Sequence, residues 1–140
     1  HPYLTVTMGT FGAAQVPVMF CAAGVGMVSA ASVATTLITQ FHADAVIFTG
    51  VAGGLKDDLK IGDIVIAKDV VNYDMDCTNF FLPWNPEYRH KRGEFPFTGL
   101  REFHSDPKLV ELALSAPHPA EMGDVSLRCG RIVTGSEFVT

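Results

Sequence analysis

Residues 46–55 read Val-Ile-Phe-Thr-Gly-Val-Ala-Gly-Gly-Leu, an apolar, β-branched run that ends in glycines. The part from Ala45 to Thr49 is typical of a buried β-strand. Ligands of open α/β sheets bind beyond the carboxyl ends of strands, and glycine lets a backbone approach a ligand closely. This stretch therefore predicts a strand that ends at a binding site.

The flanking segments predict a mixed α/β fold. Two short runs joined by a glycine-containing turn favour a hairpin, and small apolar residues at helical spacing follow. An Asp-Pro pair at 106–107 is a typical helix start. We expect strands at 4–8, 16–22, 45–49, 64–71 and 125–133, helices at about 27–41 and 107–115, and a long aromatic loop at 73–103.

Together these elements predict one domain, residues 1–140, with a mixed central sheet flanked by helices. The sequence begins with His1 and stops just after a strand and a glycine, where a doubly wound fold normally continues into a helix. We therefore expect the chain to be a fragment that is incomplete at both ends.

Composition narrows the class of function. The chain has 140 residues, is 48% hydrophobic and 18% charged, and carries a formal net charge of −5, which indicates a folded globular protein and gives no electrostatic case for binding nucleic acid. We expect the one basic run, Arg89 to Arg92, to be a solvated loop.

Three widely separated cysteines form no Cys-x-x-Cys pair, which disfavours a zinc site and favours a reducing compartment. No apolar run reaches membrane-spanning length. We expect a cytoplasmic protein, although a signal peptide removed before His1 stays an alternative.

Four segments resemble, in order, motifs of the 5'-methylthioadenosine/S-adenosylhomocysteine nucleosidases of the nucleoside phosphorylase/nucleosidase superfamily. They are residues 24–31, 49–65, 73–80 and 132–139. The resemblance implies a phosphorylase/hydrolase-like fold, no cofactor, a homodimer and hydrolysis of the N-glycosidic bond between adenine and a 5'-thio-substituted ribose. The transition state of that reaction is oxocarbenium-like.

The resemblance also implies residues that hold the purine and the ribose. Phe138 matches an aromatic ring that stacks on the purine, and Val139 matches a position whose backbone reads adenine. Ala52 and Gly53 match positions that line the base and the ribose.

Three further positions match residues around the thioalkyl end of the substrate. Val25 matches an apolar residue near that group. Cys77 and Phe80 match residues that cover it from the neighbouring subunit. The resemblance places the general acid before His1 and the other catalytic carboxylates after Thr140, so we assign no catalytic residue to this chain and expect Asp74 and Asp76 to have structural roles.

Two other functions remain open. A purine nucleoside phosphorylase must hold phosphate with cationic or hydroxyl donors. The related phosphorylases carry Arg and Ser at two positions where this chain has Phe48 and Val51, which favours hydrolysis. Val51 also departs from many of the nucleosidases, which have Ser there, and a non-catalytic nucleoside-binding relative is the second alternative.

Overall fold

The computed structural model describes residues 4–117, 123 and 125–137. The chain divides into two compact units, His1–Gly50 and Val51–Thr140. The expectation of a single domain therefore stays a prediction.

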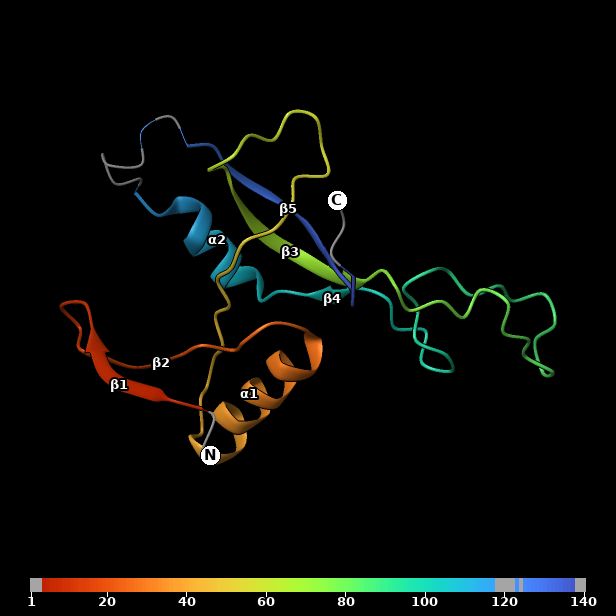
Figure 1. Ribbon diagram of the computed structural model, residues 1–140, viewed down its shortest axis with the longest axis horizontal. Coiled ribbons are helices and arrows are strands. Elements are labelled where there is room, and N and C mark those ends of the chain that lie inside the picture. The colour runs from red at the N-terminus through yellow and green to blue at the C-terminus, as the bar shows by residue number, and fades with distance from the viewer. Residues whose placement is uncertain (1–3, 118–122, 124, 138–140) are drawn as a thin grey trace. The chain divides into compact units, whose positions relative to one another are not determined.

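The first unit contains a hairpin and a helix (Figure 1). Strands β1 (Val6–Phe11) and β2 (Val16–Cys21) pair antiparallel, with Val6 opposite Cys21 and Phe11 opposite Val16. The turn between them closes through a 3.1 Å bond from the Gln15 N–H to the Gly12 carbonyl. This confirms the predicted hairpin.

Helix α1 (Met27–Gln40) follows a glycine-rich entry. Gly24 and Gly26 have φ of +73° and +94°, which side chains rarely adopt, so glycine is required at both positions. No side chain caps the helix start, but the Ser29 hydroxyl donates a 2.5 Å bond to the Ala23 carbonyl and ties the first turn to the chain that precedes it.

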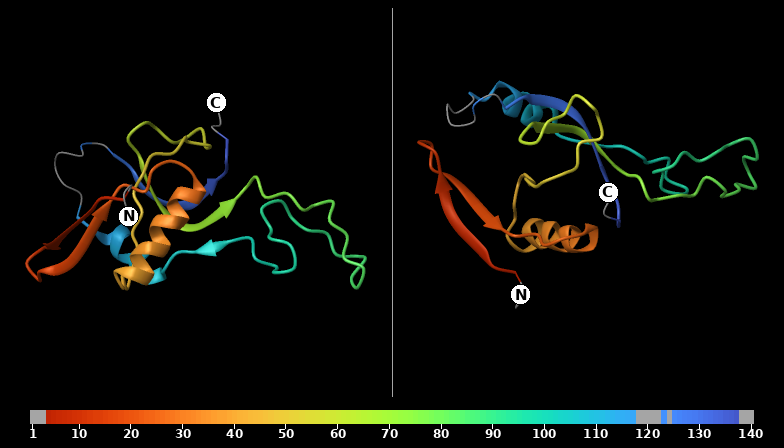
Figure 2. Two further views of the ribbon diagram at one scale, coloured as in Figure 1. Left: turned by 60° about the horizontal axis from the view of Figure 1, so that its bottom comes forward. Right: turned by 45° about the horizontal axis from the view of Figure 1, so that its top comes forward.

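The second unit is built on a mixed three-stranded sheet in the order β4-β3-β5. Strand β3 (Ile64–Asn72) is central, pairs parallel with β5 (Leu127–Thr134) and antiparallel with the short β4 (Phe103–His104). Figure 2 shows β3 and β5 side by side in both views. The mixed sheet confirms the predicted fold class.

Helix α2 (Pro107–Ser115) connects β4 to β5 and packs on the sheet. The Asp106 side chain accepts hydrogen bonds from the backbone N–H groups of Lys108 and Leu109 at 2.9 and 3.0 Å. Pro107 fits the first turn because its missing N–H has no partner there in any helix. The predicted start and end of this helix are confirmed.

The prediction of a buried strand at Ala45–Thr49 was wrong. The structure assigns no strand there, and the side chains of Ile47 and Phe48 are 76% and 75% exposed. A β-branched run forms a strand only where neighbouring strands complete its backbone ladder. Here β1 pairs with β2 and β3 pairs with β4 and β5, and none of the described strands pairs with this segment.

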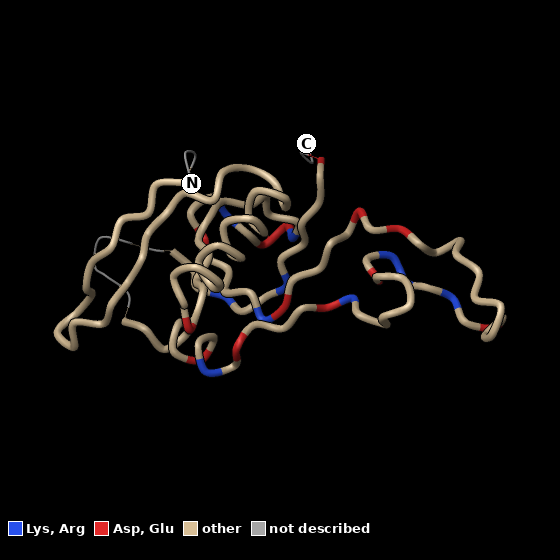
Figure 3. Tube along the Cα trace, turned by 90° about the horizontal axis from the view of Figure 1, so that it is seen from below, with Lys and Arg blue, Asp and Glu red and all other residues tan. Residues whose placement is uncertain are grey.

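Charge is unevenly distributed along the chain. Asp44 is the one Asp, Glu, Lys or Arg among residues 1–50, so the coloured segments of Figure 3 lie almost wholly in Val51–Thr140. Within the first unit, Leu37 is the one large apolar side chain that the described residues bury. That unit therefore presents an apolar, nearly uncharged surface. None of the described helices is long and apolar enough to cross a membrane.

Candidate active site

Two of the predicted motifs meet where β3 and β5 end. Because these strands are parallel, their carboxyl ends lie at one edge of the sheet, with Asn72 opposite Thr134. The Tyr73 N–H donates to the Thr134 carbonyl at 2.9 Å, and the Ser136 N–H donates to the Asp74 carboxylate at 2.5 Å. The edge thus joins the segment that leads to Phe80 with the segment that leads to Phe138.

Gly135 is required at this junction. A Cβ at Gly135 would lie 2.5 Å from a ring carbon of Tyr73, a distance that real Cβ atoms do not show. The backbone of β5 can approach the Tyr73 ring only because residue 135 has no side chain.

Asp74 and Asp76 have the structural roles that the sequence suggested. Asp74 binds the Ser136 N–H. Asp76 accepts hydrogen bonds from the Thr78 N–H and hydroxyl at 3.1 and 2.7 Å and pairs with Arg92 at 3.1 Å. The Thr78 hydroxyl, more than any other group, holds the pKa of Asp76 below its ordinary value.

Cys77 lies inside the loop that follows β3. Its side chain is buried, and its thiol donates to the Glu94 carbonyl at 2.9 Å. Burial, with a smaller contribution from the Glu94 carboxylate, raises the pKa of the Cys77 thiol. The thiol therefore stays protonated at neutral pH and acts as an apolar group with a weak donor.

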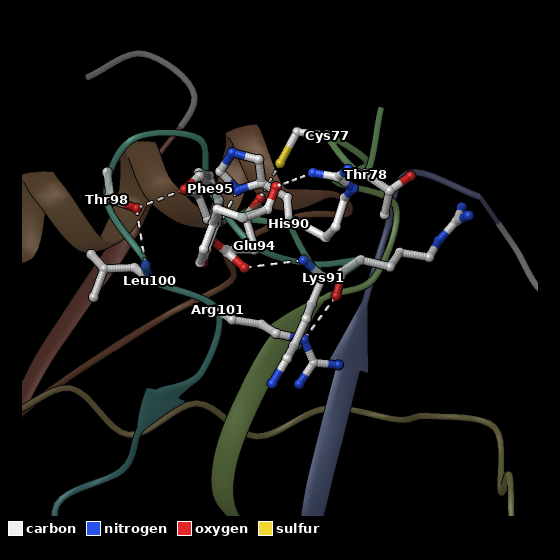
Figure 4. Close-up of polar contacts among 12 residues, drawn as sticks. Cys77, Thr78, His90, Lys91, Glu94, Phe95, Thr98, Leu100 and Arg101 are labelled. Atoms are coloured by element: carbon white, nitrogen blue, oxygen red, sulfur yellow. Dashed lines mark hydrogen bonds and ion pairs between the residues drawn. The ribbon is translucent and has the colours of Figure 1, made fainter. Parts of the chain in front are cut away.

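The interior of this loop is organised by one buried carboxylate. Glu94 accepts a hydrogen bond from the Tyr88 hydroxyl. It also accepts one from the Lys91 N–H at 3.0 Å and lies 2.9 Å from Nδ1 of His90 (Figure 4). The Tyr88 hydroxyl is the largest of the influences that lower the pKa of Glu94, so the carboxylate is ionised. The hydrogen bonds of Glu94 offset the free-energy cost of burying its charge.

The expectation that Arg89 to Arg92 form a solvated run was wrong for one of its members, His90, while Arg92 is exposed as predicted. His90 is 5% exposed, because its ring packs edge-on against Phe80 and Tyr88 and pairs with Glu94. Arg92 donates from Nε to the Tyr73 carbonyl at 2.9 Å. The spacing of four residues between His90 and Glu94 was the available signal in the sequence, but only the folded loop brings Tyr88 to the same carboxylate.

Phe80 lies at the surface of the loop. Its side chain is 45% exposed, and its ring stands edge-on to Phe97 with centroids 5.2 Å apart. A 2.8 Å bond from the Phe80 N–H to the Cys77 carbonyl closes a turn between the two predicted residues. The structure therefore places Cys77 and Phe80 together, one inside the loop and one on its surface.

Ala52 and Gly53 lie in irregular, exposed backbone. A Cβ at Gly53 would meet no atom within 4 Å, so the space beside it is open. In the described residues, no hydrogen bond joins this segment to Cys77 or Phe80. The shared role of these four residues stays a prediction.

The turn at residues 56–63, which follows Gly53, is hydrogen-bonded at the amino ends of β3 and β5. The Asp63 carboxylate accepts bonds from the N–H groups of Lys60 and Ser126 at 3.0 and 3.1 Å. The Lys60 N–H is the main cause of the lowered pKa of Asp63. Arg128 adds a 2.5 Å ion pair with Asp58. The Gly-Asp pair at 62–63 thus anchors the amino ends of β3 and β5.

Val25 belongs to the other unit, where it is 83% exposed between two glycines of positive φ. The neighbouring Gly24 lines a hollow of about 330 Å³ with Ser29, Ser32 and Thr36 of α1. Phe138 and Val139 lie outside the described residues, which end at Glu137.

A hollow of about 670 Å³ lies along α2 and is lined by Lys68, His104, Ser105 and Glu111 among others. None of the predicted site residues lines this hollow. The hollow and the sequence motifs therefore indicate different places for the site. We favour the strand edge because two motifs converge there through hydrogen bonds, one between backbones and one to the Asp74 side chain. In the residues described, no three or more His, Cys, Asp or Glu side chains form a group that could hold a metal ion.

A sequence model of the phosphorylase superfamily matches residues 2–140. The chain belongs to the phosphorylase superfamily. This match covers nearly the whole chain and agrees with the mixed sheet. It confirms the fold class on which the predicted site depends.

Similar members of the superfamily are nucleosidases. A 5'-methylthioadenosine/S-adenosylhomocysteine nucleosidase of Exiguobacterium is 36% identical over 131 residues, which are 94% of this chain and 51% of that protein. The chain spans about half the length of the curated relatives it matches.

Solved structures give the same result. The nucleosidase of Colwellia psychrerythraea in complex with adenine is 30% identical, with a TM-score of 0.84, and the match covers 100% of this chain and 53% of that one. The Neisseria meningitidis nucleosidase in complex with methylthio-immucillin-A is 32% identical, with a TM-score of 0.82 and coverage of 99% and 55%.

Proposed function

We propose that the protein hydrolyses the N-glycosidic bond of 5'-methylthioadenosine or S-adenosylhomocysteine and releases adenine and the thioribose product, as a step of purine and methionine salvage. The observation that carries the proposal is the similarity to such nucleosidases along 94% of the chain. The convergence of two of its motifs at the ends of β3 and β5 supports it.

The proposed roles of the site residues follow the resemblance. Ala52 and Gly53 form the floor beneath the base and ribose, and Phe138 and Val139 bind the purine. Val25 lies beside the thioalkyl group. Cys77 supports Phe80 from inside its loop, and Phe80 covers the thioalkyl end, with both contributed by a neighbouring subunit of a homodimer. We further propose one domain and a cytoplasmic location.

Four of the carboxylates in the described residues are poor candidates for the general acid. An acid that protonates a purine at neutral pH needs a raised pKa. Paired or hydrogen-bonded partners instead lower the pKa values of Asp63, Asp69, Asp76 and Glu94. We assign neither the acid nor the base to these 140 residues, because the resemblance places them before His1 and after Thr140.

Water is favoured over phosphate as the nucleophile because the two positions that distinguish the phosphorylases are apolar. Phe48 and Val51 offer no cationic or hydroxyl donor. A phosphate dianion without such donors would not exchange its hydration for protein contacts.

The test is adenine release by the protein expressed from its complete reading frame, measured by chromatography with and without phosphate. We expect release at the same rate in both conditions. Phosphate-dependent formation of a ribose 1-phosphate would instead establish a phosphorylase. Tight binding of the thioadenosines without turnover would establish a non-catalytic binding protein.

A further inference from the structure

The loop between β3 and β4 carries an aromatic cluster that extends beyond the predicted site residues. Phe80 stands edge-on to Phe97, and Trp84 stacks on Phe97 with ring centroids 5.9 Å apart and an angle of 30° between the ring planes. We call Phe80, Phe97 and Trp84 the aromatic triad. The resemblance assigned a role to Phe80 alone.

The triad forms a surface and not a core. Its side chains are 45%, 63% and 71% exposed for Phe80, Phe97 and Trp84. Large aromatic rings that remain open to water at one place indicate a surface that binds another apolar group. Because each ring contacts the next, an apolar group that lies on Phe80 can extend onto Phe97 and Trp84.

The backbone at Phe97 supports a functional role. Phe97 has a φ of +64°, a conformation that costs a residue with a Cβ free energy and normally favours glycine. The turn that imposes it is fixed by a 2.8 Å bond from the Phe95 N–H to the Leu100 carbonyl and by the Thr98 hydroxyl, which donates to the Phe95 carbonyl at 2.9 Å. The chain thus retains a large ring at a position where glycine would be less strained.

The triad is held from below by the buried cluster. His90 contacts the Phe80 ring edge-on at 6.3 Å and is fixed by Glu94, and Leu82, which lies between Phe80 and Trp84 in sequence, is 7% exposed. The exposed rings therefore lie on a packed base, which restricts the movement of the Phe80 ring.

We propose that the aromatic triad extends the subsite for the 5'-substituent and makes Trp84 and Phe97 specificity-determining residues. The proposal rests on the proposed function. The favoured substrates are adenosines with a large apolar 5'-thio group, because the indole N–H is the one polar group that these rings offer. The carboxylate of a homocysteine substituent would lose hydration there without gaining an adequate partner.

The test compares three substrates of the full-length protein: 5'-phenylthioadenosine, 5'-methylthioadenosine and S-adenosylhomocysteine. Trp84→Leu and Phe97→Leu should lower kcat/KM for the phenylthio substrate about three- to tenfold, the range expected for a lost aromatic contact, and leave the methylthio substrate nearly unchanged. Phe81→Leu is the matched control, since Phe81 is a 62% exposed ring in the same loop that lies outside the triad.

Equal losses for all three substrates, or the same selective loss in Phe81→Leu, would overturn the proposal. Fluorescence supplies a readout that does not depend on turnover, because Trp84 is the only tryptophan in the 140 residues. Binding of 5'-phenylthioadenosine should change the fluorescence emission of Trp84, and this change should be absent in Trp84→Leu. An unchanged emission in the native protein would contradict the triad's role.

The two readouts separate this proposal from the proposed function. If the protein hydrolyses none of the thioadenosines, the hydrolase assignment fails. A Trp84-dependent emission change with the phenylthio compound would still support the subsite in that case, and its absence would refute it.

Discussion

At the scale of single residues, Glu94 joins several groups of the loop that carries Cys77 and Phe80. Three donors converge on its carboxylate, from Tyr88, His90 and the Lys91 backbone. Its own carbonyl accepts the Cys77 thiol. One side chain and its backbone thus fix both the predicted Cys77 and the base on which Phe80 stands.

Glu94→Gln is expected to loosen the loop at 73–102 without unfolding the sheet. The amide keeps the size of the carboxylate but presents a donor toward groups that donate, so buried hydrogen bonds are lost. Limited proteolysis should cut this loop faster in the variant than in the native protein. Glu87→Gln is the control, because Glu87 is exposed in the same loop, and equal cleavage of the two variants would contradict the role of Glu94.

The same carboxylate predicts a dependence on pH. The Tyr88 hydroxyl, followed by the Lys91 N–H and His90, lowers the pKa of Glu94 from its ordinary value of 4.5. The stabilisation is therefore complete above that value and is lost as the pH falls through the lower pKa of the folded state. Protection of the loop from protease or hydrogen exchange should fall in this acid range, and the Glu94→Gln variant should lack this part of the pH dependence. A native loop that keeps full protection through the range would refute the prediction.

At the scale of elements, the parallel pairing of β3 and β5 positions the site. It aligns the Tyr73–Asp74 and Gly135–Ser136 segments although they are 62 residues apart in the chain. The buried Asp69 of β3 reinforces the pairing, because both of its oxygens bind Arg131 of β5. Arg131 also reaches Glu102 at 2.8 Å, next to β4, so one ionic network spans the three strands.

Gly135→Ala should disrupt the strand edge. The new Cβ would lie 2.5 Å from the Tyr73 ring, and the ring or the strand must shift. Overpacking of this kind costs about 1–3 kcal/mol, measured as a loss of unfolding free energy in denaturant. Gly9→Ala is the matched control, because a Cβ at Gly9 meets no atom within 4 Å. If both variants lose the same stability, the contact with Tyr73 is not the cause.

At the scale of the whole molecule, the surface of the first unit and the proposed role of Phe80 both point to association. Residues 1–50 contain one charged residue apart from histidine, and Met8, Phe11 and Phe20 of the hairpin are 60% or more exposed. A surface of this kind is typical of a protein interface. We expect the full-length protein to be a dimer in sedimentation equilibrium.

Mixed dimers can show which subunit Phe80 serves. Phe80→Ala removes the ring that covers the thioalkyl end of the substrate. Gly53→Val adds a side chain to the floor beneath the base and the ribose. If Phe80 acts on the neighbouring subunit, one site of a heterodimer is complete. Its floor comes from the Phe80→Ala subunit, and its cover is Phe80 of the Gly53→Val subunit. Co-expression should then restore adenine release to about a quarter of the native rate, because about half of the randomly assembled dimers are mixed and one of their two sites is complete. If Phe80 acts within its own subunit, both sites stay defective and the mixture stays inactive.

The sequence by itself determined the family, the hairpin, both helices and the two paired strands of the sheet, because local propensities, caps and glycine positions are written in neighbouring residues. It also located Cys77 and Phe80 in one loop. Only the tertiary structure decided that residues 45–49 are not a strand, since a strand exists through its partners, and that His90 is buried beside Glu94. The meeting of Asp74 with Ser136 and the joining of Trp84 and Phe97 to Phe80 likewise depend on contacts across the fold, which no local pattern encodes.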